Sequence, residues 1–203
     1  MKKLILGVCL LFSANIYADL ISDGKTAMKQ YNYKKAQEVF AKSCESGAGQ
    51  GCFYLAHLYY RGLGVQEDVS KAVELWGKAC DNGYAGACSS IGRVYESGGG
   101  LEADYKKAIE YYTKGIDGGD ANSCMNLGSM YYKGKSLEQD FEKAVDLFKK
   151  TCDLGNSTGC VFAADVYMTK KNKKYNINTA KELYKKSCDL GNAYGCKRYK
   201  QLN

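Results

Sequence analysis

The sequence predicts an all-α fold, a right-handed α/α solenoid in which pairs of helices repeat every 36 residues. Three observations predict it. Similar segments recur at that spacing without a gap, glycines recur at fixed places within them, and the 203 residues include no proline, which the interior of a helix tolerates poorly. Repeats of this length are typical of proteins in which each unit packs only on its neighbours.

The first residues are predicted to be a signal peptide and not part of the solenoid. Lys2 and Lys3 precede an apolar run over residues 4–12, which contains Cys9, and Ala18 supplies the small residue that signal peptidase requires. We therefore expect cleavage near Ala18 and a secreted or periplasmic protein. No later segment is apolar enough to predict a transmembrane segment.

Residues 19–203 are predicted to form a single solenoid domain. Its repeats are expected at about 19–51, 52–87, 88–123, 124–159 and 160–195, followed by a partial helix over 196–203. The repeat at 52–87 begins "CFYLAHLYYRGLG", and the same pattern of residue types returns in the later copies.

The first helix of each repeat is indicated by small and large apolar residues spaced three and four apart. In the repeat at 52–87 these are Leu55, Ala56 and Tyr59, which share one helix face at that spacing. Glycine-rich loops then end the helix: "RGLG" (61–64), "SGGG" (97–100) and "KGKS" (133–136). Glycine is favoured there because a helix end often needs a positive φ.

The second helix follows a recurring acidic or amide residue that is expected to cap it. These residues are Asp68, Asp104, Asp140 and, in the last copy, Asn176. An alanine and a large apolar pair follow, for example Ala72 and Leu75-Trp76, and a glycine such as Gly83 ends the helix. The result is a predicted stack of antiparallel helix pairs.

The period also predicts how the cysteines pair. One cysteine ends each second helix and the next begins the following repeat, with seven residues and a glycine turn between them, so the two can approach to disulfide distance. The predicted disulfides are Cys44–Cys52, Cys80–Cys88, Cys152–Cys160 and Cys188–Cys196. Cys124 is left as a free thiol because its expected partner is Ile116. It is either a buried apolar group or a residue that links to another molecule or responds to redox conditions.

The repeated pattern "LG..Y..G.G....D..KA......KAC..G...AC" resembles the Sel-like repeat, a relative of the tetratricopeptide repeat. With a cysteine at each junction and a signal peptide, the chain resembles the Helicobacter-type cysteine-rich proteins. The departures are Ile116, the loss of loop glycines in "MTKKNKKYN" (168–176) and a degenerate first copy. The resemblance implies an exported, disulfide-bridged protein that binds penicillins, from a family catalogued as β-lactamases with weak hydrolytic activity.

The residues themselves give little support to an enzyme, and no catalytic residue is predicted. His57 is the only histidine, and Arg93, Ser129 and Asp165 occupy its column in the other repeats, so we interpret it as an exposed, variable position. One histidine and cysteines committed to disulfides do not make a zinc site, and neither a metal nor a cofactor is expected. "SDGK" (22–25) matches Ser-x-x-Lys by spacing, but the Ser-Asp-Asn and Lys-Thr-Gly motifs that should accompany it are missing.

A binding groove is better supported than catalysis. The first helices of related repeats line a concave surface, and their exposed columns differ between copies here, although ordinary drift would also produce such variation. The predicted ligand-binding groove contains Tyr60, Arg61, Asn126 and Tyr132, because aromatic and arginine side chains commonly dominate interfaces. The expected ligand is a peptide, a partner protein or a cell-wall fragment, with a β-lactam as a possible mimic of the last. A weak β-lactamase is the alternative function.

Nucleic acid is not an expected partner. From Lys170 onward the chain has ten basic and two acidic residues, but the rest of the solenoid is slightly acidic and the basic residues are not interleaved with its repeated aromatics.

Overall fold

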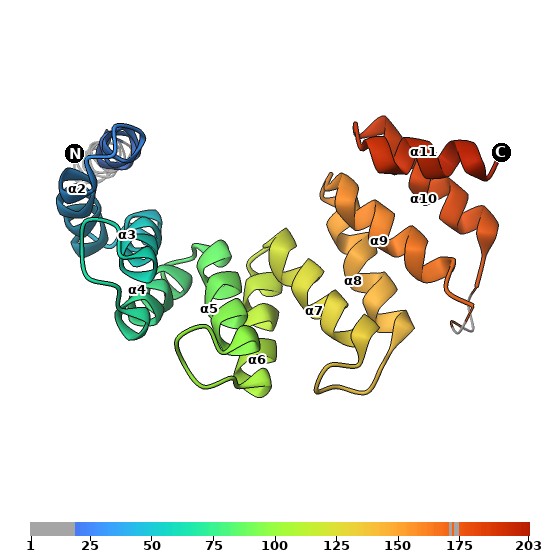
Figure 1. The fold of residues 1–203 in the computed structure, drawn as a ribbon, viewed down its shortest axis with the longest axis horizontal. Helices are drawn as coiled ribbons and strands as arrows, with labels where there is room; N and C mark the ends of the chain where they lie inside the picture. The colour runs from blue at the N-terminus through green and yellow to red at the C-terminus, as the bar shows by residue number, and fades with distance from the viewer. Residues whose placement is uncertain (1–18, 171, 173–174) are drawn as a thin grey trace, which may run out of the picture. The chain divides into compact units, whose positions relative to one another are not determined.

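The computed structural model describes residues 19–170, 172 and 175–203, and this part of the chain is built from helices joined by short loops, without a strand (Figure 1). The predicted signal peptide, residues 1–18, lies outside the described residues. Two compact units divide the chain between Asp104 and Tyr105, and each is described by itself. The all-α class predicted from the repeat period is confirmed.

The helices of each unit follow one another along the chain and pack on their neighbours in the same order. In the first unit, residues 19–29 are helical and are followed by α2 (Tyr33–Glu45), α3 (Gly49–Arg61), α4 (Val69–Asp81) and α5 (Ala85–Ser97). The second unit contains α6 (Tyr105–Asp117), α7 (Ala121–Lys133), α8 (Phe141–Asp153), α9 (Ser157–Tyr167), α10 (Ile177–Asp189) and α11 (Ala193–Gln201). This sequential packing of repeated helix pairs is the predicted solenoid arrangement.

The odd-numbered helices α3, α5, α7, α9 and α11 are the first helices of the predicted repeats. Each of the five begins three residues before the cysteine at which the sequence period was started; α3, for example, begins at Gly49 and contains Cys52. The disulfide cysteine therefore lies within the first turn of these helices, where its backbone is already held in helical geometry.

Capping residues fix where α4, α8 and α10 begin, as the sequence predicted. The side chain of Asp68 accepts a hydrogen bond from the Lys71 backbone N–H at 2.8 Å, and that of Asp140 accepts one from Lys143 at 2.9 Å. Asn176 does the same for α10. Such a cap satisfies a backbone donor that the first helical turn leaves without a partner. The caps of α7, α9 and α11 by Asp120, Asn156 and Asn192 are a further set that the sequence analysis did not identify.

The core of each unit consists of alanines against large side chains. Ala72, Ala108, Ala144 and Ala180 are all completely buried, and one large residue of the same helix lies beside each of them in the interior: Trp76, Tyr112, Phe148 and Tyr184. An alanine lets the neighbouring helix approach closely, and the aromatic ring then fills the remaining volume.

Disulfides join the end of each even-numbered helix to the next odd-numbered helix at four of the five junctions. They are Cys44–Cys52, Cys80–Cys88, Cys152–Cys160 and Cys188–Cys196, with Cα atoms 4.4 to 5.1 Å apart. The backbones nearly touch here: a Cβ built on Gly159 would lie 2.8 Å from the Cys152 backbone nitrogen. The prediction of disulfides at the repeat junctions is confirmed as part of the fold.

The loop after α9 replaces the missing glycines with a buried amide. α9 ends at Tyr167 with Met168 as its C-cap in ordinary right-handed geometry, whereas α3, α5 and α7 end in a left-handed glycine. Asn172 is 4 % exposed, and its Nδ2 donates to the Val166 carbonyl oxygen at 3.2 Å. The amide thus satisfies a helix-end acceptor that the glycine motif satisfies elsewhere.

Candidate functional site

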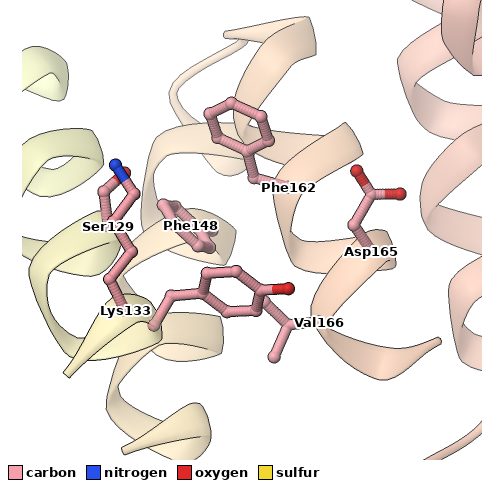
Figure 2. Close-up of a pocket in the computed structure, with 7 residues that line it drawn as sticks. Ser129, Lys133, Phe148, Phe162, Asp165 and Val166 are labelled. Carbon is pink, nitrogen blue, oxygen red and sulfur yellow. The ribbon is translucent and has the colours of Figure 1, made fainter. Parts of the chain in front are cut away.

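The second unit contains a cavity of about 230 Å³ between its odd-numbered helices α7 and α9, with α8 beneath them. It is lined by Ser129, Tyr132 and Lys133 of α7, Phe148 of α8, and Phe162, Asp165 and Val166 of α9 (Figure 2). Helices α7 and α9 stand in equivalent positions of adjacent repeats, so the cavity is made by two repeats together.

Three aromatic side chains, Tyr132, Phe148 and Phe162, line the cavity. Phe148 is only 3 % exposed, and Phe162 is 38 % exposed. Their ring centroids are 5.4 Å apart and the ring planes are tilted by 57°. Tyr132 is half-buried and packs against Phe141, with ring centroids 5.7 Å apart. A partly exposed aromatic ring beside a buried one presents an apolar surface on which a ligand can pack.

Asp165 places a carboxylate on the α9 side of the cavity. Its Oδ1 atom accepts a hydrogen bond from the Tyr184 hydroxyl of α10, and the guanidinium carbon of Arg198 lies 5.3 Å from the Tyr184 ring centroid. Burial raises the pKa of Asp165 above its usual value, while the Tyr184 hydrogen bond and the Arg198 charge act in the opposite direction. Burial also raises the pKa of Tyr184, and its bond to Asp165 adds to that rise.

The α7 side of the cavity is polar but carries no activated nucleophile. The Ser129 hydroxyl donates to the Met125 carbonyl oxygen at 2.9 Å, one helical turn back, which is ordinary for a helical serine. Lys133 is exposed and extends on the opposite side of the two phenylalanine rings from Asp165 (Figure 2). The arrangement suits binding, with an apolar middle and opposite charges at its two sides.

The four predicted groove residues fall in different places. Tyr132 lines the cavity, whereas Asn126, on the same helix and half-buried, is not among its lining residues. Tyr60 and Arg61 belong to the first unit: the Tyr60 ring packs on Trp76 at 5.2 Å between centroids, and Arg61 is exposed at the end of α3. The structure therefore places one of the four at the candidate site.

The column of His57 was misinterpreted in the sequence. His57 is half-buried, not exposed, and its pKa is lowered, first by burial and then by the charges of Arg61 and Arg93. The members of this column in the second unit, Ser129 and Asp165, both line the cavity. The only sign in the sequence that this column lines a site was its variation between copies, which was interpreted as lack of constraint.

Positions 72 residues earlier, in the first unit, carry different chemistry. Trp76 corresponds to Phe148, Ser90 to Phe162 and Arg93 to Asp165. The Phe162 ring and the Asp165 acid therefore have no counterpart in the α3–α5 pair, so they are not a property of every repeat.

Other candidate chemistry receives little support. Cys124 is a free cysteine that is 1 % exposed, and burial raises the pKa of its thiol. In the Ser-x-x-Lys match at 22–25, Ser22 is exposed, and the ammonium of Lys25 lies 5.1 Å from the Tyr54 ring centroid. Among the described residues, no group of three or more histidine, cysteine or acidic side chains could hold a metal ion. No helix in the described part of the chain is long and apolar enough to cross a membrane.

Solved structures share the architecture. A protective antigen with an SLR fold from uropathogenic Escherichia coli is similar over 92 % of this chain, with a TM-score of 0.75 and 22 % identity, and this chain covers 41 % of that one. A Sel1 repeat protein from Oxalobacter formigenes matches 82 % of this chain, with a TM-score of 0.69 and 26 % identity; 66 % of its own length is covered.

A cysteine-rich relative is also found. Cysteine-rich protein B of Helicobacter pylori is 26 % identical over 64 % of this chain and 94 % of its own length, with a TM-score of 0.52. Together with the four disulfides, which persist in oxidising compartments, it indicates an extracytoplasmic protein. None of the curated proteins matches this chain.

The family model of the Sel1 repeat matches residues 49–84, 85–120, 121–156 and 168–192, which is more than half of the chain. Its first three boundaries coincide with the starts of α3, α5 and α7. The chain belongs to the Sel1 repeat family, as the resemblance in its sequence predicted.

Proposed function

We propose that this protein is an exported binding scaffold that holds a segment of a partner protein at the cavity between α7 and α9. The Sel1 repeat scaffold is suited to protein–protein interaction. The observation that carries the more specific proposal is Phe162, a large apolar side chain that is 38 % exposed at the rim of a cavity lined by two further aromatic rings.

Aromatic side chains around a buried pocket are the usual centre of a protein interface. In such interfaces a few residues carry most of the binding free energy, and the surrounding contacts exclude water. Phe148 is held rigidly in the core of the second unit, so its ring is positioned before a partner arrives. Preformed geometry reduces the ordering cost of binding.

Export supports the choice of partner. A scaffold stabilised by four disulfides is suited to an oxidising compartment, where its ligands are other exported proteins or the cell wall. We favour a protein segment because an apolar, side-chain-sized cavity suits one amino-acid side chain. A cell-wall fragment and a penicillin, which mimics one, are the other ligands that the test must separate.

The test selects binders from a displayed library of short random peptides and compares variants of the full chain. Phe162→Ser is expected to weaken the selected peptides by about thirtyfold, the effect of losing an interface aromatic worth about 2 kcal/mol. Leu154→Ser is the matched control, because Leu154 is 56 % exposed but lies outside the cavity. Soluble wall peptide and benzylpenicillin are added as competitors.

Peptides that bind Phe162→Ser as tightly as the unaltered chain would refute the site. Displacement by wall peptide at concentrations that leave a control peptide–protein pair intact would move the assignment to the cell wall. Circular dichroism of both variants confirms that neither has lost the fold.

A further inference from the structure

The size of the α7–α9 cavity limits what enters it. Pockets that enclose whole small molecules typically measure roughly 300–1,000 Å³. This cavity, at about 230 Å³, is smaller and therefore fits one side chain of a larger ligand. The question is which side chain its walls would select.

The walls suit an apolar chain that ends in a cation. Phe148, Phe162 and Tyr132 present rings, and Val166 adds an aliphatic wall. A methylene chain can lie against these groups, and aromatic faces attract cations that pass close to them. Neutral aliphatic side chains would also fit the walls, so the polar groups must decide.

Asp165 is the carboxylate that lines the cavity, and it retains accepting capacity. A carboxylate offers about four lone-pair positions. The Asp165 carboxylate accepts a hydrogen bond from Tyr184 at Oδ1, and the charge of Arg198 acts on it from beyond the Tyr184 ring. Asp165 is half-buried, so its charge is screened less than that of the exposed Lys133.

The charge of Asp165 therefore acts more strongly on a group in the cavity than the charge of Lys133 does. Asp165 faces the cavity with Tyr184 and Arg198 behind it, and Lys133 lies across the rings from it (Figure 2). A cation placed beside Asp165 stays on the far side of the rings from Lys133. An acidic side chain would gain only a solvent-screened partner in Lys133 and would be repelled by the less screened Asp165.

We propose that the side chain accepted by this cavity is a lysine of the partner segment, with its methylene chain on Phe148 and Phe162 and its ammonium at Asp165. Lysine is favoured over arginine because Tyr184 already occupies Oδ1. The remaining oxygen suits a compact ammonium better than the two-pronged contact of a guanidinium. This inference rests on the proposed binding function and specifies its ligand.

The test uses four small probes with the same n-pentyl chain and different ends: n-pentylammonium, n-pentylguanidinium, n-pentanol and hexanoate. Each is titrated into the nitrogen-15-labelled full chain, and the backbone amide signals of Phe162 and Val166 are followed by NMR. We expect n-pentylammonium to bind about tenfold more tightly than n-pentanol, and hexanoate to bind weakest. Asp165→Asn, which keeps an oxygen for the Tyr184 bond, should abolish the preference of ammonium over alcohol, while Leu154→Ser keeps it.

Equal binding of the ammonium and the alcohol, or a preference for hexanoate, overturns the lysine assignment and leaves the proposed binding function in place. A preference for n-pentylguanidinium replaces lysine with arginine and overturns the assignment as stated. Absence of any shift at Phe162 and Val166 overturns the cavity as a binding site and, with it, the site of the proposed function. The probe series in the unaltered chain decides these outcomes even if the Asp165 variant is poorly folded.

Discussion

Restoring the missing cysteine at the third junction should create a fifth disulfide. Ile116 is the last residue but one of α6 and stands where the other junctions have the first cysteine, and Cys124 lies in the first turn of α7. The turn between them is already formed like the others. The Gly119 backbone N–H donates to the Ile116 carbonyl at 3.0 Å, as Gly47 does to Cys44 at 3.0 Å, and Gly119 has a φ of +83° beside +83° for Gly83.

The magnitude follows from two opposing effects of Ile116→Cys. Closing a nine-residue loop contributes about 2.6 kcal/mol by the chain-entropy estimate. Losing part of a half-buried isoleucine costs about 1 kcal/mol, since full burial is worth about 1.5–3 kcal/mol. The oxidised variant should therefore be about 1.5 kcal/mol more stable than the unaltered chain, which raises the melting temperature by about 3–6 °C.

The assay compares Ile116→Cys and the unaltered chain under mild reduction that leaves the other bridges intact, and under oxidation. Peptide mapping shows whether the new bond reaches Cys124, and hydrogen exchange of α6 and α7 amides reports local stability, because repeat proteins need not unfold as one unit. An oxidised variant in which Cys124 can still be alkylated after unfolding would refute the assumption that the third junction has the geometry of the other four. A bridged variant that is less stable than the unaltered chain would refute the magnitude.

Three further predictions follow from individual contacts. Asp140→Ala should destabilise the fold by about 1 kcal/mol in urea unfolding because α8 loses its cap. The hydrogen bond from Lys143 holds the pKa of Asp140 below its usual 3.8. The difference in unfolding free energy between the variant and the unaltered chain should therefore vanish as pH falls through that lowered pKa. Tyr184→Phe should cost about 1–2 kcal/mol at neutral pH by removing the donor to Asp165. Because the pKa of Asp165 is raised, this cost should shrink on acidification as the carboxyl protonates, and a cost that grew instead would contradict the assignment. The oxidised chain should hydrolyse a chromogenic cephalosporin no faster than a reduced and alkylated sample. The reasons are that the Lys25 ammonium lies over the Tyr54 ring and that no activated serine lines the cavity. Turnover that requires the disulfides would restore the β-lactamase alternative.

The repeat period predicted the fold because each structural column must perform the same task in every copy. Ala72 and its counterparts must all be small where helices approach, and Asp68, Asp140 and Asn176 must all cap a helix. These demands recur every 36 residues, so they are visible in a single sequence. The cysteine pairing was predictable for the same reason, since the turn between the two cysteines is part of the repeat.

The junctions also contain a compensation that single columns do not reveal. Three of them place glycine against a hydroxyl residue, as Gly159 lies against Thr151. At the third junction the glycine is on the other helix: Ser123 occupies the glycine position and Gly115 the hydroxyl position. The sum of the two side chains stays nearly constant because the helices approach too closely for both to be large. This rule becomes visible only when the two positions are known to touch.

The cavity could not be predicted from the columns because it is made by two repeats and, apart from the column of Ser129 and Asp165, uses different columns from each. Tyr132 comes from late in α7, Phe162 from early in α9, and Phe148 from the helix between them. Variation at these positions is produced either by drift or by selection for a ligand. The placement of the three residues around one cavity favours selection for a ligand. Phe162 is the informative case: the copies in the first unit have Tyr54 and Ser90 in its column, so no structural demand for phenylalanine exists there. Its ring packs on Phe148, but 38 % of the residue stays exposed beside the cavity, and it is this exposed part that the proposed binding role explains.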